Sequence, residues 1–121
     1  MKITDLKPTI VWKFFHQVTQ VPRPSKKEGK MIEFLESFAK EYKIAIKKDE
    51  AGNLLMSKPA TPGMEDRPVV VLQSHMDMVC EKNNGTKHDF DNDPIETIVD
   101  GEWLRANGTT LGADNGIGVA A

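Results

Sequence analysis

The run Val69-Val70-Val71-Leu72 constrains the fold of this 121-residue chain more than any other feature. It contains only apolar residues, most of them β-branched, with no polar residue between them. A strand with one face in water alternates polar and apolar residues, whereas a strand covered on both faces does not. The run therefore predicts an inner strand of an α/β sheet that is covered by helices on both faces.

Two amphipathic helices are predicted before this strand. The first carries apolar residues at i, i+3, i+4 and i+7, and the second continues the same spacing. These residues are Val11, Phe14, Phe15 and Val18 in the first helix, and Met31, Phe34, Leu35, Phe38 and Tyr42 in the second. Pro22 and Pro24 separate the helices, because proline lacks a backbone donor and disfavours a helical predecessor. Ser25 and Glu28 predict a capping box for the second helix.

Two β-hairpins are predicted, one on each side of the apolar run. The first joins residues 44–47 to residues 53–56 through a turn-forming segment. The second joins residues 95–99 to residues 103–105 through Asp100-Gly101, a dipeptide that favours a tight turn. With the helices, these elements predict an α/β fold class, a mixed sheet flanked by helices.

Composition and charge narrow the functional class. Hydrophobic residues make up 39% of the chain and charged residues 28%, as is typical of soluble globular proteins. The net charge of −2 leaves no basic excess to attract nucleic acid or an anionic membrane, so neither is an expected partner. Cys80 is the only cysteine, and no apolar stretch is long enough for a secretory signal or a membrane span. Cytoplasmic localisation is therefore expected.

The first residues suited to chemistry are Ser74-His75-Met76-Asp77, directly after the predicted strand. Sites in open α/β sheets form at the carboxyl ends of strands. One ring nitrogen of His75 can bind a metal while Asp77 accepts the proton of the other, which fixes the tautomer. The structural alternative is that His75 caps the strand and Asp77 is a solvated loop carboxylate. From this triplet alone the structural alternative is favoured.

The second such residue is Asp114, which lies between Gly112 and Gly116 where a helix of small residues is predicted to begin. A carboxylate there can bridge two cations, which in such sites lie roughly 3.5–4 Å apart. An aspartate just before a helix is more commonly an N-cap, and the local pattern favours that role. The glycines match neither the dinucleotide fingerprint nor the P-loop.

Taken in order, the motifs resemble those of the aminoacyl-histidine (Xaa-His) dipeptidases, a branch of the M20 metallopeptidases. The resemblance runs over essentially the whole chain, and the stretch from Gly108 to Gly118 is its most specific part. Its other motifs include Val21-Pro22-Arg23-Pro24-Ser25, Gly52-Asn53-Leu54, the segment from Val71 to Val79, and Asp100-Gly101-Glu102-Trp103. This order of motifs favours the metal-binding interpretation of the histidine and aspartates over the structural one.

The resemblance implies that His75 ligates one metal, that Asp114 bridges two, and that Asp77 is the catalytic aspartate that orients His75. It implies two zinc ions, with manganese or cobalt as substitutes. It also implies a dinuclear-metal dipeptidase that hydrolyses Xaa-His and other unsubstituted dipeptides with a metal-bridged water.

In the family, a Glu-Glu pair supplies the general base and one ligand, and a lid domain contacts substrate and mediates homodimer formation. Neither feature is found in residues 1–121. These residues are therefore expected to be the N-terminal part of the catalytic domain, incomplete and inactive by itself, with no second domain.

Two alternatives remain open. One is a related M20 or aminopeptidase-type hydrolase that acts on N-acyl or longer peptides. The other is a non-catalytic binding module that retains the fold. The stretch from Trp103 to Gly118 favours the dipeptidase branch, and a Glu-Glu pair in the parent protein would argue against the binding module.

Overall fold

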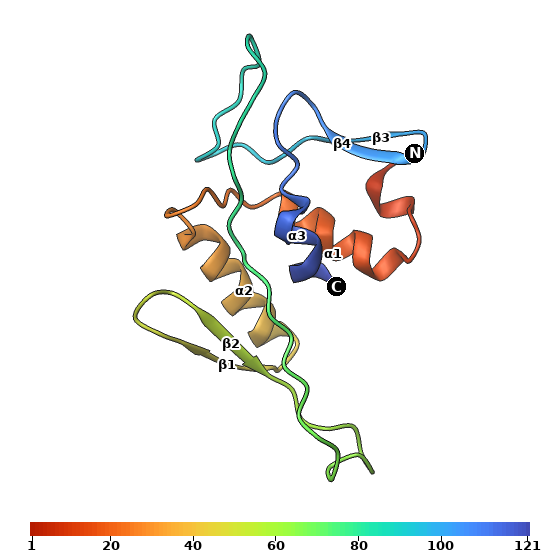
Figure 1. Ribbon diagram of the computed structural model, residues 1–121, viewed down its shortest axis with the longest axis vertical. Coiled ribbons are helices and arrows are strands. Elements are labelled where there is room, and N and C mark those ends of the chain that lie inside the picture. Colours follow the sequence, from red (N-terminus) through yellow and green to blue (C-terminus); the bar gives the residue numbers. More distant parts are fainter. The chain divides into compact units, whose positions relative to one another are not determined.

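The computed structural model describes all residues from Met1 to Ala121, and the chain divides into two compact units. The first unit contains residues 1–31 and 74–121, and the second contains residues 32–73. Figure 1 colours the elements along the chain. In order, they are η1 (Ile3–Asp5), α1 (Thr9–Thr19), α2 (Gly29–Glu41), β1 (Ala45–Lys48), β2 (Leu54–Ser57), β3 (Thr97–Asp100), β4 (Trp103–Ala106) and α3 (Ala113–Ala120).

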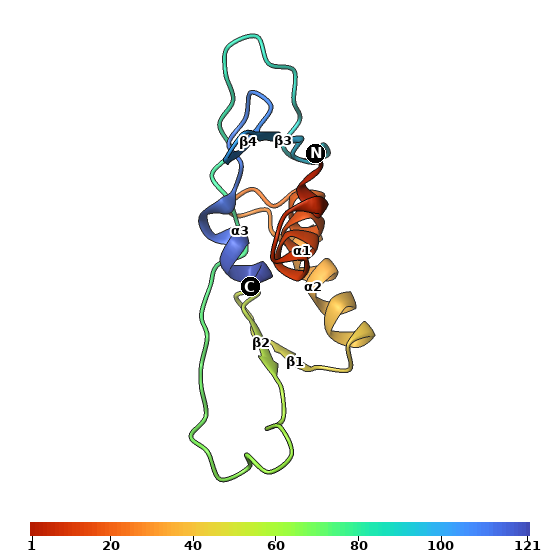
Figure 2. The same cartoon turned by 90° about the vertical axis from the view of Figure 1, so that its right-hand side faces the viewer.

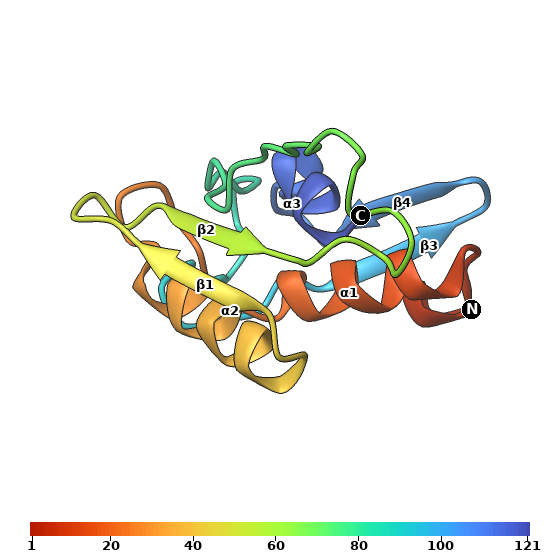
Figure 3. The same ribbon diagram turned by 90° about the horizontal axis from the view of Figure 1, so that it is seen from below.

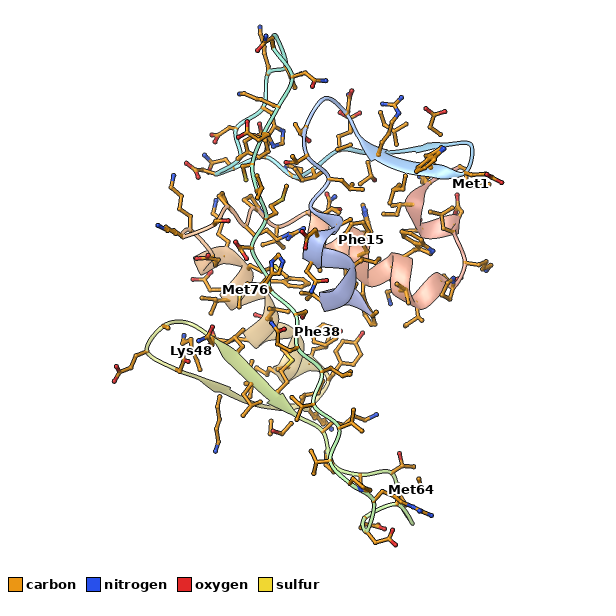
Figure 4. The ribbon with its side chains drawn as sticks, in the orientation of Figure 1. Met1, Phe15, Phe38, Lys48, Met64 and Met76 are labelled. Atoms are coloured by element: carbon orange, nitrogen blue, oxygen red, sulfur yellow. The ribbon has the colours of Figure 1, made fainter.

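Helices α1 and α3 lie side by side and form the core of the first unit (Figures 1 and 2). Phe15 is only 1% exposed and projects from α1 toward α3 (Figure 4). It forms one buried cluster with Ile3 and Ala120. The small residues of α3 permit this close packing, since a Cβ atom on Gly116 would lie 3.1 Å from the Phe15 ring. The helix predicted from the small-residue tail is therefore confirmed.

The β3–β4 hairpin belongs to the same unit. Its strands are antiparallel, and Asp100 pairs with Trp103 across the tight turn. Gly101 in that turn has a φ of 60°, a conformation that glycine adopts without steric cost. Ala106 at the end of β4 is buried with Met78 and Ile95 in a second apolar cluster. The predicted hairpin is confirmed.

The second unit contains most of α2 and the β1–β2 hairpin. The two strands of this hairpin are antiparallel and lie side by side in Figure 3. Asp49 shapes its turn: the Asp49 Oδ1 atom accepts the backbone N–H groups of Ala51 and Asn53 at 2.9 and 2.8 Å. These hydrogen bonds, with that from the Asn53 side chain foremost, lower the pKa of Asp49. No helix of either unit has the length and apolar character needed to cross a bilayer.

The predicted inner strand at Val69–Leu72 is wrong for this chain. The segment belongs to no sheet, and its four side chains are 79–90% exposed. A strand is buried on both faces only when neighbours pair with it and helices cover it, and neither of the two-stranded sheets here pairs with this segment. The mixed sheet flanked by helices is accordingly replaced by three helices and two separate two-stranded antiparallel sheets. The α/β class holds in this coarser form.

The predicted capping box is also wrong. Helix α2 begins at Gly29, and the Glu28 carboxylate instead accepts the backbone N–H of Lys26 at 2.7 Å. The Ser25 hydroxyl donates to Asp77, 52 residues away in the sequence. Ser25 therefore does not cap α2 and instead contacts Asp77.

We expect replacement of Val70 and Leu72 by threonine to change the free energy of unfolding by no more than about 0.5 kcal/mol, because both side chains are already in water. The matched core substitution, Phe15→Ala, should cost about 3–5 kcal/mol, since it leaves a cavity between α1 and α3. Chemical denaturation of the three proteins measures both values. A large loss from the threonine pair would show that the segment is buried.

Candidate metal centre

The candidate site is built on three segments of the first unit, around residues 23–25, 75–83 and 108–114. The first two segments form a short parallel pairing. The backbone N–H of Met78 donates to the Arg23 carbonyl at 3.0 Å, and that of Ser25 donates to the Met78 carbonyl at 3.3 Å. Residues just before α2 are thereby attached to the chain that follows His75.

The second and third segments form an antiparallel pairing. The N–H of Asn83 donates to the Gly108 carbonyl and that of Thr110 to the Glu81 carbonyl, both at 2.8 Å. The Thr110 hydroxyl also donates to the Val79 carbonyl at 2.7 Å. These hydrogen bonds bring the turn before α3 alongside the segment that carries His75.

His75 is the centre of the site because each of its ring nitrogens faces a carboxylate. Its Nδ1 atom lies 3.0 Å from Asp77 Oδ1 and 3.2 Å from the Asp77 carbonyl oxygen. Its Nε2 atom lies 3.0 Å from Asp114 Oδ1. The structure thus brings together all three residues singled out from the sequence, although Asp114 is 39 positions away from His75.

The two carboxylates raise the pKa of His75, with Asp114 as the principal cause and Asp77 adding to it. The physical reason is that a carboxylate beside each ring nitrogen favours the doubly protonated imidazolium. The His75 side chain is 48% exposed, so water weakens both interactions.

Asp114 does not cap α3. The backbone is not helical at Asp114 and Asn115, so the regular turns of α3 begin after these two residues, and Asp114 Oδ1 lies against the His75 ring instead of a backbone N–H. Asp114 itself has φ −88° and ψ 106°, and its side chain is 96% exposed on the side of His75. The N-cap interpretation favoured by the local sequence pattern is therefore wrong, and the carboxylate is left available to solvent and to the imidazole.

Ser25 completes the arrangement from the other side of Asp77. Its hydroxyl donates to Asp77 Oδ2, while Oδ1 of the same carboxylate faces His75. The Ser25 hydrogen bond is the main reason that the pKa of Asp77 is lowered. Sequence reasoning missed this residue, because its spacing to Glu28 matches a capping box and nothing in the local pattern points to Asp77.

The two atoms His75 Nε2 and Asp114 Oδ1 suit a zinc ion as donors. Zinc binds imidazole nitrogen and carboxylate oxygen at about 2.0–2.2 Å, which places two donors of one tetrahedral ion roughly 3.3 Å apart. The observed separation of 3.0 Å is that of a hydrogen bond, so the two atoms would move a few tenths of an ångström apart to take an ion between them. Asp77 faces the other ring nitrogen of His75, Nδ1. No group of three or more His, Cys, Asp or Glu side chains in the chain could hold a metal ion. The residues fit a metal as part of a ligand set.

Comparison with known proteins finds dipeptidases that are similar to the chain along nearly its whole length. No family model matches it. The chain is 49% identical over 120 residues to the cytosol non-specific dipeptidase of Escherichia coli (strain K12). This alignment covers 99% of the chain and 25% of that protein. It matches the crystal structure of the aminoacylhistidine dipeptidase from Vibrio alginolyticus with a TM-score of 0.96 and 48% identity, over 99% of this chain and 24% of that one.

Both of the proteins that the chain matches are named as dipeptidases. Within that class, the resemblance to the aminoacyl-histidine dipeptidases is confirmed over the whole chain. The chain spans about a quarter of the length of these relatives.

We expect Asp114→Asn to lower the pKa of His75, because it removes the carboxylate that most favours the imidazolium. A raised folded-state pKa stabilises the protein fully below the unfolded-state pKa, and this contribution is lost as pH rises through the folded-state value. The substitution should therefore reduce stability at mildly acidic pH and not at alkaline pH. NMR titration of the His75 ring tests this, with the exposed Asp100→Asn as control. An unchanged His75 pKa in Asp114→Asn would contradict the assignment.

Proposed function

We propose that the protein containing this chain is a metal-dependent dipeptidase, and that this chain contributes His75, Asp77 and Asp114 to its catalytic centre. The observation that carries the proposal is the hydrogen-bonded series from Asp77 through His75 to Asp114, in a chain that matches dipeptidases along its whole length. The substrates proposed are Xaa-His and other unsubstituted dipeptides. Residues 1–121 are then the N-terminal part of the catalytic domain.

In this proposal, Nε2 of His75 and the carboxylate of Asp114 are metal ligands. Asp114 can serve two cations at once, since its side chain is 96% exposed and offers an oxygen to each. The donor types suit zinc, with manganese or cobalt as substitutes. A pair of such ions, when bound, supplies a water of lowered pKa and polarises the scissile carbonyl.

The role of Asp77 is to hold the His75 ring in its ligating form. Its Oδ1 atom accepts the proton on Nδ1. Nε2 is then the ring nitrogen that would give up its proton, which is directed at Asp114, and bind the cation in its place. Ser25 fixes the Asp77 carboxylate by donating to the other oxygen. The imidazole is thus oriented through a neighbour that is itself held in place.

The remaining requirements of the reaction fall to other parts of the protein. Hydrolysis needs a general base near the attacking water, and each zinc ion needs about four donors. We propose that residues beyond these 121 supply them, and that a lid domain contacts the dipeptide and forms a homodimer. A cytosolic location accords with the name of the Escherichia coli relative. A parent protein that bound dipeptides without cleaving them would instead support a binding module.

Zinc titration of the isotopically labelled chain tests the ligands directly. We expect zinc to shift the NMR signals of the His75 ring, and His75→Ala to abolish specific binding. Because the proton competes with the metal for Nε2, affinity should rise as pH increases through the raised pKa of His75. His88→Ala is the matched control, since the His88 ring packs edge-on against Phe90 with the ring centroids 4.5 Å apart. Zinc binding that survives His75→Ala would contradict the assignment.

We expect the 121-residue chain to release no amino acids from a dipeptide, even when it is saturated with zinc. The reason is that no group of three or more possible ligands is present, and that the Glu-Glu pair that supplies the general base in the family is not found in residues 1–121. The parent protein should be active, and Asp77→Asn in it should lower metal affinity or activity by about 10- to 100-fold. Chromatographic detection of the released amino acids measures both activities. Turnover by the isolated chain would refute the expectation.

A further inference from the structure

The first observation concerns Arg23, whose side chain is only 1% exposed. Its Nη1 atom donates to the carbonyls of Met76 and Asp77 at 3.1 and 3.3 Å. Its Nη2 atom donates to the Gly112 carbonyl at 2.8 Å. One planar guanidinium therefore bonds to the segment that carries His75 and Asp77, and also to the turn that leads into Asp114.

The second observation is the space that the guanidinium occupies. A Cβ atom on Gly112 would lie 2.5 Å from Arg23 Nη2, and one on Gly116 would lie 2.6 Å from the same atom. Any larger residue at either position would displace the guanidinium. The Gly112 carbonyl also accepts the N–H of Gly116 at 3.1 Å, so the arginine bonds to the same carbonyl that begins α3.

The third observation is that burial of the Arg23 guanidinium costs free energy. The guanidinium has given up water, and burial is the main reason that the pKa of Arg23 is lowered. The buried Nε atom has no hydrogen-bond partner. An apolar side chain could fill the space without this cost, but it could not join carbonyl groups of two separate segments.

We propose that Arg23 is a positioning residue, whose guanidinium joins the backbone beside His75 to the backbone before Asp114 and so sets the distance between the two metal-binding side chains. Met76, which it binds, follows His75 directly, and Gly112 lies two residues before Asp114. The inference deepens the proposed function and rests on it for the role of the two side chains. The hydrogen bonds of the Arg23 guanidinium all go to backbone carbonyls.

The test uses two substitutions that disturb the guanidinium in different ways. Arg23→Lys retains the positive charge but loses the planar fork, so one ammonium group cannot bond to both segments in the same way. Gly116→Ala retains the arginine but places a methyl group 2.6 Å from Nη2. The same methyl group lies 3.1 Å from the Phe15 ring, so thermal unfolding of this variant reports the separate cost to the packing of α1 on α3. Alanine also favours the helix more than glycine does, so a loss of function from Gly116→Ala would not arise from helix propensity. Arg105→Lys is the matched control, because Arg105 is exposed and bonds only to Asp100.

The first readout is metal-free: the nuclear Overhauser contact between the His75 ring and the Asp114 side chain. We expect it in the unsubstituted chain and in Arg105→Lys, and we expect it to weaken or disappear in Arg23→Lys and Gly116→Ala. Thermal unfolding of the same samples shows whether each variant is folded. Retention of the contact in both folded variants would overturn the inference. If Arg23→Lys does not fold, the Gly116→Ala result decides.

The second readout is zinc affinity, followed by NMR with zinc ion alone as the probe. We expect both variants to bind zinc about 10-fold more weakly, in the range seen for residues that hold a ligand in place. In the Arg23→Lys background, Gly116→Ala should add little, because both changes disrupt the same contact. Unchanged affinity and fully additive losses would each count against the inference. If His75→Ala leaves zinc binding intact, the proposed function fails, and the metal-free contact still decides the role of Arg23.

Discussion

The contact between the His75 ring and Asp114 is the interaction on which the candidate site depends. It joins residues separated by 39 positions, and it exists only because two backbone pairings and one buried guanidinium hold their segments together. The ring, in turn, is oriented by Asp77, and Asp77 is held by Ser25. Ser25 thus holds Asp77, and Asp77 holds the His75 ring that faces Asp114.

Much of the fold could be predicted from the sequence, because helices and hairpins depend on residues close together in the chain. The period of the apolar residues in α1 and the Asp100-Gly101 turn are signals of this local kind. Val69–Leu72 failed for the opposite reason: an apolar run shows that a segment prefers burial, whereas burial itself requires neighbours that pair with it and cover it. In this chain, neither two-stranded sheet pairs an outer edge with the segment, and no helix covers it.

The residues of the candidate site could be named from the sequence, whereas the residues that hold them in place could not. His75 and Asp77 are two positions apart, so the spacing places them on the same side of an extended segment, but it does not by itself bring their side chains into contact. Their proximity to Asp114 depends on Arg23, which acts on backbone carbonyls and leaves no pattern of paired side chains in the sequence. Gly116 is the one sequence feature related to this contact, since its missing side chain makes room for the guanidinium. Glycine is more often interpreted as a source of backbone freedom.

The exposure of Asp114 has a consequence for how a cation would behave in these residues alone. With a carboxylate 96% open to solvent and an imidazole about half open, a bound ion would keep water molecules on its outer side. Such an ion exchanges readily with bulk solution and is removed quickly by a chelator, and different divalent ions compete for it chiefly by their intrinsic preference for nitrogen and oxygen. Slow release and selectivity for one metal require a wall on the open side of Asp114.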